Sequence, residues 1–408
     1  MKNINNKIKD WPIIIKICLY TTSQYILPKG YFMKNIATII VILLLMPSIA
    51  LSTMSSPTFE LKQTTTLPPA FSWRNINSTD FTTSIKNQAP APTCEAYALV
   101  AALDTLIQYE VGYPFECDLS EAHLFFYPGG TCEWGIDVKD AADYLVEYGV
   151  PDEGCFPDPH RPHDTPFKSL EGWENRTVKI TEWGWIPNEE NAIKQALIEH
   201  GPLVICMLVR PDFSYYTGGI YKPQWGDVNG GHVITIVGYN DSQHCYLIKN
   251  SWGPKWGEDG WIRVDYDAHT EEYPFIWPFY GGTGILYVDG IYGNLQPDVP
   301  RVYIDEPARH YTFFLGYKFK SILKNLPNIP AGGLPRIFSY AQAEINTTEV
   351  DYVEFYIDQE LIGVDFDPPY QWRVSESHGP HTLEVYVYDS NGNTSKGIRD
   401  FYILNKFF

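Results

Sequence analysis

The stretch from Gln88 to Val111 constrains the fold of this chain more than any other. A proline-containing approach leads to Thr93, and apolar residues then recur at helical spacing up to a stop at Gly112. Such a stripe indicates a helix whose apolar face packs against the protein core. Thr93 is predicted to be the N-cap of this helix. Cys94 therefore lies in the first turn. The free backbone N–H groups and the positive dipole end there favour a thiolate, the form of cysteine that attacks carbon.

Two segments far along the chain give this cysteine its context. Gly230-Gly231-His232 opens a β-branched, strand-like run, and Asn250-Ser251-Trp252 follows a second such run. Taken singly, a cysteine at a helix start is more often a small buried hydrophobe, and the histidine and asparagine would be ordinary core and turn residues. Cys94, His232 and Asn250 in this order, each at the end of a regular element, resemble the papain (cathepsin) cysteine peptidase family.

Further segments fit the pattern of this family: Gln88 six positions before the cysteine, a Gly-Gly-Ile-Tyr turn at 218–221, and the run from Trp256 to Trp261. The resemblance covers about 67–292. It implies an α+β, papain-like fold of two lobes, a helical lobe followed by a β-barrel lobe. Besides the helix after Cys94, helices are expected over 119–124, 138–148 and 188–200, and strands over 203–209, 232–239, 245–249 and 261–266.

The resemblance also assigns catalytic roles. His232 would take the proton of Cys94, whose thiolate would attack a peptide carbonyl and form an acyl-enzyme (thioester) that water clears. Asn250 would accept a hydrogen bond from the imidazole, and Trp252 would shield that bond. Gln88 would donate its side-chain amide to the oxyanion, together with the Cys94 backbone N–H. No cofactor and no metal are expected.

The partners implied by the family are protein or peptide substrates. The main specificity pocket is expected to accept an apolar side chain. The residues expected to bind substrate are Gly135, Val138, Cys206, Gly230, Gly231 and Trp252.

The chain departs from the family pattern at several positions. Ala91 replaces a cysteine of one family disulfide, and another family disulfide lacks both ends, so Cys132 and Cys155 could pair instead. Glu95 stands where the family usually has a tryptophan. Its charge either suits the first helical turn or opposes the thiolate and moves the optimum pH. An aromatic insertion at 273–282 is expected to pack against the barrel lobe or to extend the cleft rim.

Residues 1–55 are interpreted as a leader. Met33-Lys34-Asn35 opens an apolar segment, Ile36 to Met46, and small residues follow at Ser48 and Ala50. This is the charged start, apolar centre and cleavage spacing of a signal peptide, which makes Met33 a candidate for the true start. The segment is short for a spanning helix, although an uncleaved membrane anchor is the alternative. The protein is therefore predicted to be secreted or held at the cell surface.

The leader and a short connector at 56–66 precede the peptidase domain, predicted over 67–298. A second unit is predicted over 299–408, where apolar residues alternate in strand-like runs around 353–357 and 383–387. Together with Pro368-Pro369-Tyr370 and the turn at 388–393, these runs resemble bacterial-type immunoglobulin-like domains. That resemblance implies a β-sandwich, which would tether the enzyme or bind a surface partner.

Composition restricts the function classes. A net charge of −19 and a pI near 4.9 argue against a nucleic-acid binder, which would carry a basic face. The sequence therefore predicts an exported cysteine endopeptidase. The alternative is a catalytically decayed, papain-like surface adhesion or binding protein, with the changes at Ala91 and Glu95 as early signs of decay. Retention of four residues favours the enzyme: Gln88, Cys94, His232 and Asn250.

Overall fold

The computed structural model describes residues 66–115, 117–158, 168–278, 282–295, 299–304, 311–314, 317–320, 329–331, 336–342, 350–374 and 379–403. The predicted leader, with Met33 as its candidate start, lies outside these ranges. In the part of the chain described, no helix is both long and apolar enough to cross a membrane. Residues 56–408 cluster into one compact unit, and the boundary expected at 298–299 stays a prediction.

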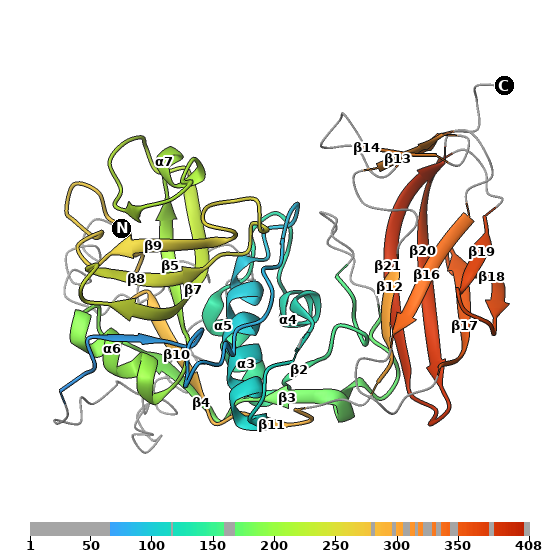
Figure 1. The fold of residues 1–408 in the computed structure, drawn as a ribbon, viewed down its shortest axis with the longest axis horizontal. Coiled ribbons are helices and arrows are strands. Elements are labelled where there is room, and N and C mark those ends of the chain that lie inside the picture. The colour runs from blue at the N-terminus through green and yellow to red at the C-terminus, as the bar shows by residue number, and fades with distance from the viewer. Residues whose placement is uncertain are drawn as a thin grey trace, which may run out of the picture. The chain divides into compact units, whose positions relative to one another are not determined.

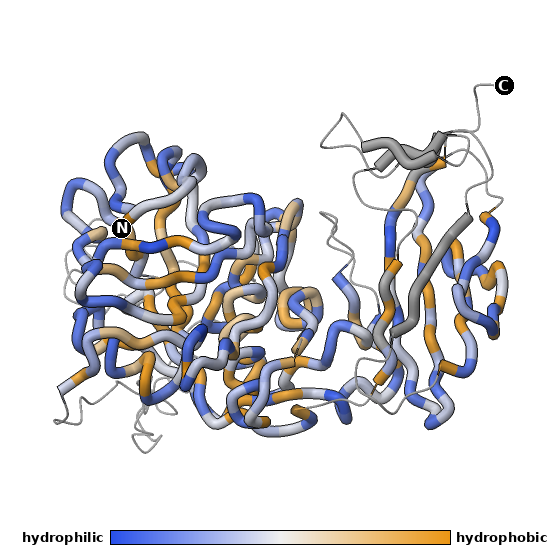
Figure 2. Tube along the Cα trace, in the orientation of Figure 1, coloured by the Kyte–Doolittle hydropathy of each residue, from blue (hydrophilic) through white to orange (hydrophobic). Residues whose placement is uncertain are grey.

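Three helices build the first lobe: α3 (Cys94–Val111), α4 (Glu121–Phe126) and α5 (Val138–Glu147) (Figure 1). The observed α3 has the bounds that the apolar stripe predicts. It ends at Gly112, whose φ of 90° lets its N–H reach the carbonyls of Gln108 and Tyr109. The side chains of this helix and of its two neighbours form one continuous core, which Figure 2 shows as hydrophobic segments along these elements.

The caps of these helices follow the sequence only in part. Ser120 accepts the N–H of His123 at the start of α4, as expected. Asp137 accepts the N–H of Lys139 at the start of α5. Thr93 is the N-cap of α3, as predicted, and its carbonyl accepts the N–H of Tyr97, but its hydroxyl makes no capping bond.

The second lobe is an eight-stranded sheet in the order β4-β10-β5-β7-β8-β9-β6, with β1 paired to β7. The strands predicted over 203–209 and 245–249 match β5 and β8 residue for residue. Buried side chains of this sheet and of α6 form a second core. The bounds are β1 (Ala70–Ser72), β4 (Glu182–Trp185), β5 (Leu203–Val209), β6 (Ile220–Tyr221), β7 (Gly230–Asn240), β8 (Cys245–Lys249), β9 (Trp261–Asp265), β10 (Ile285–Asp289) and α6 (Glu190–Glu199).

Short elements connect the two lobes, and the aromatic insertion packs against the barrel. Ile276 bridges Met207 of β5, and Phe275 is buried in the second core, so the packing role expected for the insertion is confirmed there. The remaining elements of this part are β2 (Val150–Pro151), β3 (Thr177–Lys179), β11 (Tyr292–Gly293), α7 (Pro211–Ser214) and a 3₁₀ helix, η2 (Trp173–Arg176).

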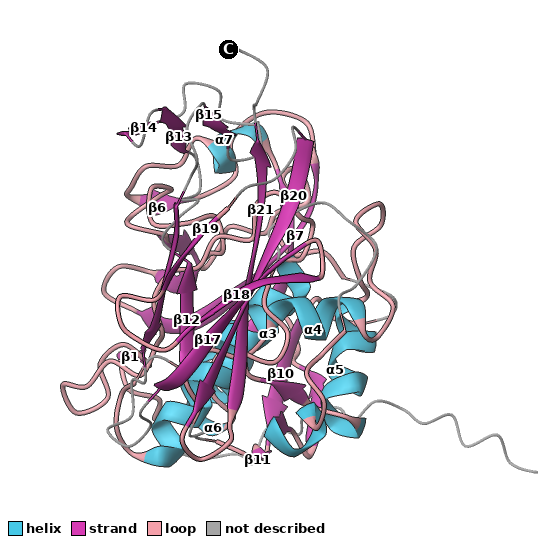
Figure 3. Ribbon diagram, turned by 90° about the vertical axis from the view of Figure 1, so that its right-hand side faces the viewer, coloured by secondary structure: helices cyan, strands magenta, loops and turns pink. Residues whose placement is uncertain are grey.

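The C-terminal strands form separate sheets. A four-stranded sheet has the order β18-β17-β20-β21, and Figure 3 shows its long strands β20 and β21 side by side. Alternate residues of β17 and β20 are buried in one core together with Ile304 of β12, as period-two alternation predicts. The bounds are β12 (Arg301–Ile304), β13 (Tyr311–Phe314), β14 (Tyr317–Lys320), β15 (Ile329–Ala331), β16 (Arg336–Gln342), β17 (Val350–Ile357), β18 (Glu360–Asp365), β19 (Gln371–Arg373), β20 (Gly379–Asp389) and β21 (Thr394–Ile403).

A buried histidine in α4 gives the first lobe a pH-dependent stability. His123 stacks on Tyr127 with ring centroids 3.9 Å apart and packs against Trp173. Burial lowers the pKa of His123 from 6.5 to about 3. Between these pH values the folded chain binds fewer protons here than the unfolded chain. The contribution of His123 to stability is therefore complete above pH 6.5 and is lost as the pH falls toward 3.

We expect His123→Phe to remove this loss. Between pH 7 and pH 5 the free energy of unfolding of the wild type should fall by about 2 kcal/mol relative to that of His123→Phe. Urea titrations at the two pH values measure the difference. The control is Phe156→Leu, a change to a ring that packs against His123, which should destabilise equally at both pH values. A His123→Phe variant whose stability follows the wild type at both pH values would contradict this account.

Candidate active site

Cys94 is the first residue of α3, and its thiol lies against the start of β7. The backbone N–H of Val233, the residue after His232, donates to the Cys94 sulfur. Farther along the helix, the Thr235 hydroxyl donates to the Ala98 carbonyl over 2.9 Å. The helix tip and the histidine segment, far apart in sequence, are thus adjacent in the fold.

The His232 ring is held in one tautomer. Its Nε2 lies 2.8 Å from Asn250 Oδ1, and the Ser251 backbone N–H donates to the same oxygen over 2.8 Å. Because that N–H can only donate, the shared atom accepts both bonds, and Nε2 carries the hydrogen. The neutral ring therefore has its lone pair on Nδ1. Trp252 stacks on the imidazole with ring centroids 4.7 Å apart.

Gln88 lies next to the Asn250 segment. Its backbone N–H donates to the Ser251 carbonyl over 2.9 Å, and its side-chain oxygen accepts the Ser251 hydroxyl over 2.6 Å. Its Nε2 donates one hydrogen to the Ala91 carbonyl over 3.2 Å. An amide nitrogen carries two hydrogens, so the orientation of the side chain is fixed while one N–H is left for another acceptor.

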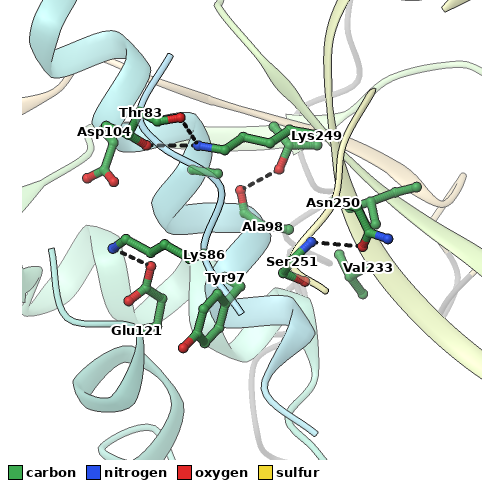
Figure 4. A pocket seen from close by; sticks show the side chains of 13 residues that line it. Thr83, Lys86, Tyr97, Ala98, Asp104, Glu121, Val233, Lys249, Asn250 and Ser251 are labelled. Atoms are coloured by element: carbon green, nitrogen blue, oxygen red, sulfur yellow. Dashed lines mark hydrogen bonds and ion pairs between the residues drawn. The ribbon is translucent and has the colours of Figure 1, made fainter. Parts of the chain in front are cut away.

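Two lysines that the sequence analysis missed hold the segment leading to Gln88. The Lys249 ammonium donates to the carbonyl and to the hydroxyl of Thr83, each over 2.8 Å, as Figure 4 shows. Lys86 pairs with Glu121 over 2.7 Å. A lysine inside an apolar strand run, such as Lys249, indicates a buried polar contact, because a buried ammonium needs hydrogen-bond acceptors. A cavity of about 20 Å³, the space of roughly one water molecule, lies between these residues and Asn250.

The surroundings of the Cys94 thiol oppose its ionisation. Burial, followed by the charge of Glu95, raises the pKa of Cys94 well above its usual value. The thiol donates to Glu95 Oε2 over 3.4 Å, and burial raises the pKa of Glu95 to about 7. Burial also lowers the pKa of His232 to about 4. Burial and the neighbouring acid thus oppose the thiolate that the helix dipole favours.

The residues predicted to bind substrate differ in their exposure. Gly230 and Gly231 are exposed, and the Trp277 ring lies directly over Gly231. Gly135 has a φ of 75° and faces the Glu95 carboxylate. Val138 corrects the prediction: it is 1% exposed and belongs to the helical core, so its side chain is not presented to a ligand.

The predicted bridge between Cys132 and Cys155 is not formed. No disulfide joins any of the six cysteines that the structure describes. Cys155 is fully buried, and its thiol donates to Asp152 Oδ2 over 3.6 Å, whereas Cys132 is only partly buried. The sequence could not show that the nearest partner of Cys155 is an acid.

One exposed group in the described part could bring three metal-ligand atoms together. His244, Asp265 and Asp267 have ligand atoms within 4.8 Å of one another. The Lys222 ammonium lies 3.5 Å from the Asp265 carboxylate, and its charge opposes a cation there. The group is not among the residues around Cys94.

The sequence comparison agrees with the arrangement of this site. The family described as "Papain family cysteine protease" matches residues 67–273, which is half of the chain. The chain belongs to the papain family of cysteine proteases. It is thus a cysteine-type peptidase, a hydrolase.

Individual papain-family relatives cover this chain to different extents. Mexicain from Jacaratia mexicana is 30% identical over 198 residues, which are 48% of this chain and 88% of mexicain. Cathepsin B-like CP2 from Giardia intestinalis is 46% identical over 176 residues, but the match covers only 55% of that protein and 40% of this chain. Among solved structures, that of the bromelain protease from Ananas comosus has a TM-score of 0.44 and 24% identity, and the match covers 54% of this chain and 99% of that one.

We expect Glu95→Gln to make the Cys94 thiol more acidic. Above pH 7 the carboxylate is mostly ionised and disfavours the thiolate, so its removal should lower the thiol pKa by about one unit or more. The rate of alkylation by iodoacetamide as a function of pH measures this shift. The control is Glu110→Gln, which makes the same charge change at the exposed end of α3. Identical alkylation profiles for Glu95→Gln and the wild type would contradict the assignment.

Proposed function

We propose that this protein is an exported cysteine endopeptidase that hydrolyses peptide bonds through Cys94, His232 and Asn250. The observation that supports this most is the tautomer of His232. With Nε2–H bound to Asn250, the lone pair of Nδ1 is available to take the thiol proton. The Cys94 sulfur accepts the backbone N–H of Val233, the residue after His232.

The first step transfers a proton from the Cys94 sulfur to His232 Nδ1. Burial disfavours each charge taken alone. A transfer inside the pair creates both charges together, and their attraction offsets part of the desolvation cost. Trp252 keeps water from the imidazole–Asn250 bond and so preserves the orientation of the ring.

The thiolate then attacks the substrate carbonyl carbon, and the carbonyl π electrons move to its oxygen. The Cys94 backbone N–H and the second Gln88 Nε2 hydrogen are the donors that would stabilise this oxyanion. His232 returns its proton to the leaving amine as the C–N bond breaks, which leaves a thioester. Water, deprotonated by the neutral ring, cleaves the thioester and releases the acid.

We further propose that the remaining parts deliver and hold this enzyme. The leader would direct export or anchor the chain at a membrane. The C-terminal unit would be an immunoglobulin-like β-sandwich that binds a surface partner or recruits substrate. The buried alternation of β17 and β20 supports a layered β unit, while the immunoglobulin-like assignment rests on the sequence resemblance.

Covalent labelling tests the nucleophile. An epoxide that reacts with thiolates should modify Cys94 at neutral pH, and peptide hydrolysis should stop in proportion to labelling. Cys94→Ala should show neither labelling nor hydrolysis, because the nucleophile is gone. The matched control is Cys245→Ala, which removes another buried thiol and should leave labelling at Cys94.

Folded wild-type protein that hydrolyses no peptide and is not labelled at Cys94 would refute the proposal. The catalytically decayed binding protein would then be the better description.

A further inference from the structure

The outer face of the C-terminal sheet β18-β17-β20-β21 is built from tyrosines and glutamates. Alternate residues of β17 and β20 are buried in the core of this unit, so the residues between them point to the opposite side of the sheet. The six that form its centre, called the tyrosine face below, are Tyr352, Glu354, Tyr356, Glu384, Tyr386 and Tyr388. All of them except Glu384 are partly exposed.

The strand register sets rings and carboxylates of the tyrosine face opposite one another. Tyr352 of β17 pairs with Tyr388 of β20. Their rings stack with centroids 4.5 Å apart and planes 17° apart. The next outward pair on the two strands is Glu354 and Tyr386. The aromatic rings are thus packed into one continuous surface that surrounds a carboxylate.

The hydroxyl hydrogens of this surface are used internally. The hydroxyls of Tyr356 and Tyr388 both donate to Glu354 Oε2, each over 2.9 Å. The Tyr386 hydroxyl donates to Glu384 Oε2 over 2.9 Å. Carboxylates only accept, and a hydroxyl that has donated its hydrogen can only accept further bonds. These groups therefore offer a ligand acceptors and ring faces, but no hydrogen-bond donor.

One cation of this chain already lies against the tyrosine face. Lys396 of β21 pairs with Tyr386 of β20, and its ammonium lies 5.9 Å from the centroid of the Tyr386 ring. The ammonium is committed to a hydrogen bond with the Lys168 carbonyl over 2.8 Å. It occupies the β21 side of the face, whereas the bonds given above for Glu354 come from neutral hydroxyls. Negative charge therefore remains on the β17 side.

Exposed apolar side chains continue the tyrosine face beyond β17. Leu361 of β18 pairs with Tyr356 and is 52% exposed. Phe366 is 64% exposed, and its ring centroid lies 5.7 Å from that of Tyr352. Exposed apolar side chains that adjoin one another are typical of a surface that contacts another protein. A ligand of this face would therefore combine cationic ends with apolar stems.

We propose that the tyrosine face binds an arginine-containing basic segment of a partner protein. A guanidinium has five N–H donors and no acceptor, which complements a face of acceptors. Its plane stacks on aromatic rings, and its charge is opposite to that of Glu354. The inference specifies the partner class of the C-terminal unit, whose binding role is part of the proposed function, and it does not depend on Cys94.

Three labelled peptides test the inference on the full chain. Cys94→Ala is used so that the probe is not cleaved. The peptides alternate glycine with arginine, lysine or citrulline, and fluorescence anisotropy gives their Kd values. The arginine peptide should bind about tenfold more tightly than the citrulline peptide, which keeps the shape and lacks the charge. It should bind several-fold more tightly than the lysine peptide, because an ammonium does not stack as a plane.

Variants then locate the binding surface. In the Cys94→Ala background, Glu354→Gln and Tyr386→Leu should each weaken binding of the arginine peptide several-fold. The matched controls are Glu110→Gln and Tyr113→Leu, which make the same changes at exposed positions of the helical lobe and should keep the affinity. The comparison of the three peptides needs no change in the face, so it decides even where Tyr386→Leu fails to fold.

Two results would overturn the inference. Equal Kd values for the arginine and lysine peptides, unchanged by Glu354→Gln, would show attraction by net charge alone. Binding of a neutral oligosaccharide such as cellohexaose in place of the arginine peptide would assign the face to glycans. Either result leaves the peptidase function intact, because that function is decided by hydrolysis and by labelling of Cys94.

Discussion

The packing of α3 against β7 is the interaction on which the rest of the structure depends. The Thr235 hydroxyl bonds the Ala98 carbonyl across residues 137 positions apart. Lys249 ties the segment before the helix to β8, and Ser251 holds Gln88. These bonds fix the helix tip relative to the strand that carries His232. Without these bonds, nothing would hold the thiol and the imidazole, which come from two different lobes, near each other.

The same packing determines the electrostatic surroundings of the Cys94 thiol. A helix N-terminus favours an anion, but the Cys94 thiol is buried and has an acid as its immediate neighbour. Burial and the neighbouring acid therefore oppose the charge that the helix N-terminus favours. Glu95 acts on this balance, since its carboxylate opposes the thiolate when ionised.

The sequence predicts those features that local patterns encode. The bounds of α3 follow from its apolar stripe and Gly112, and β5 and β8 follow from apolar runs between turn residues. The proximity of Cys94 to the His232 segment followed from a family resemblance, not from periodicity. What could not be predicted depends on tertiary partners. Lys249 needs Thr83 from a distant segment, Cys155 meets an acid instead of a cysteine, and Val138 faces the core because α5 packs on its neighbours.

The central claim is that the Cys94 sulfur faces Nδ1 of His232, and a short bifunctional alkylating reagent tests it most directly. 1,3-Dibromoacetone should react first with Cys94 and then bridge to His232, so that digestion and mass spectrometry recover one linked pair of peptides. The link should be at Nδ1, because Nε2 is bound to Asn250. Singly alkylated Cys94 with no link to His232, or a link to any other residue, would contradict the account.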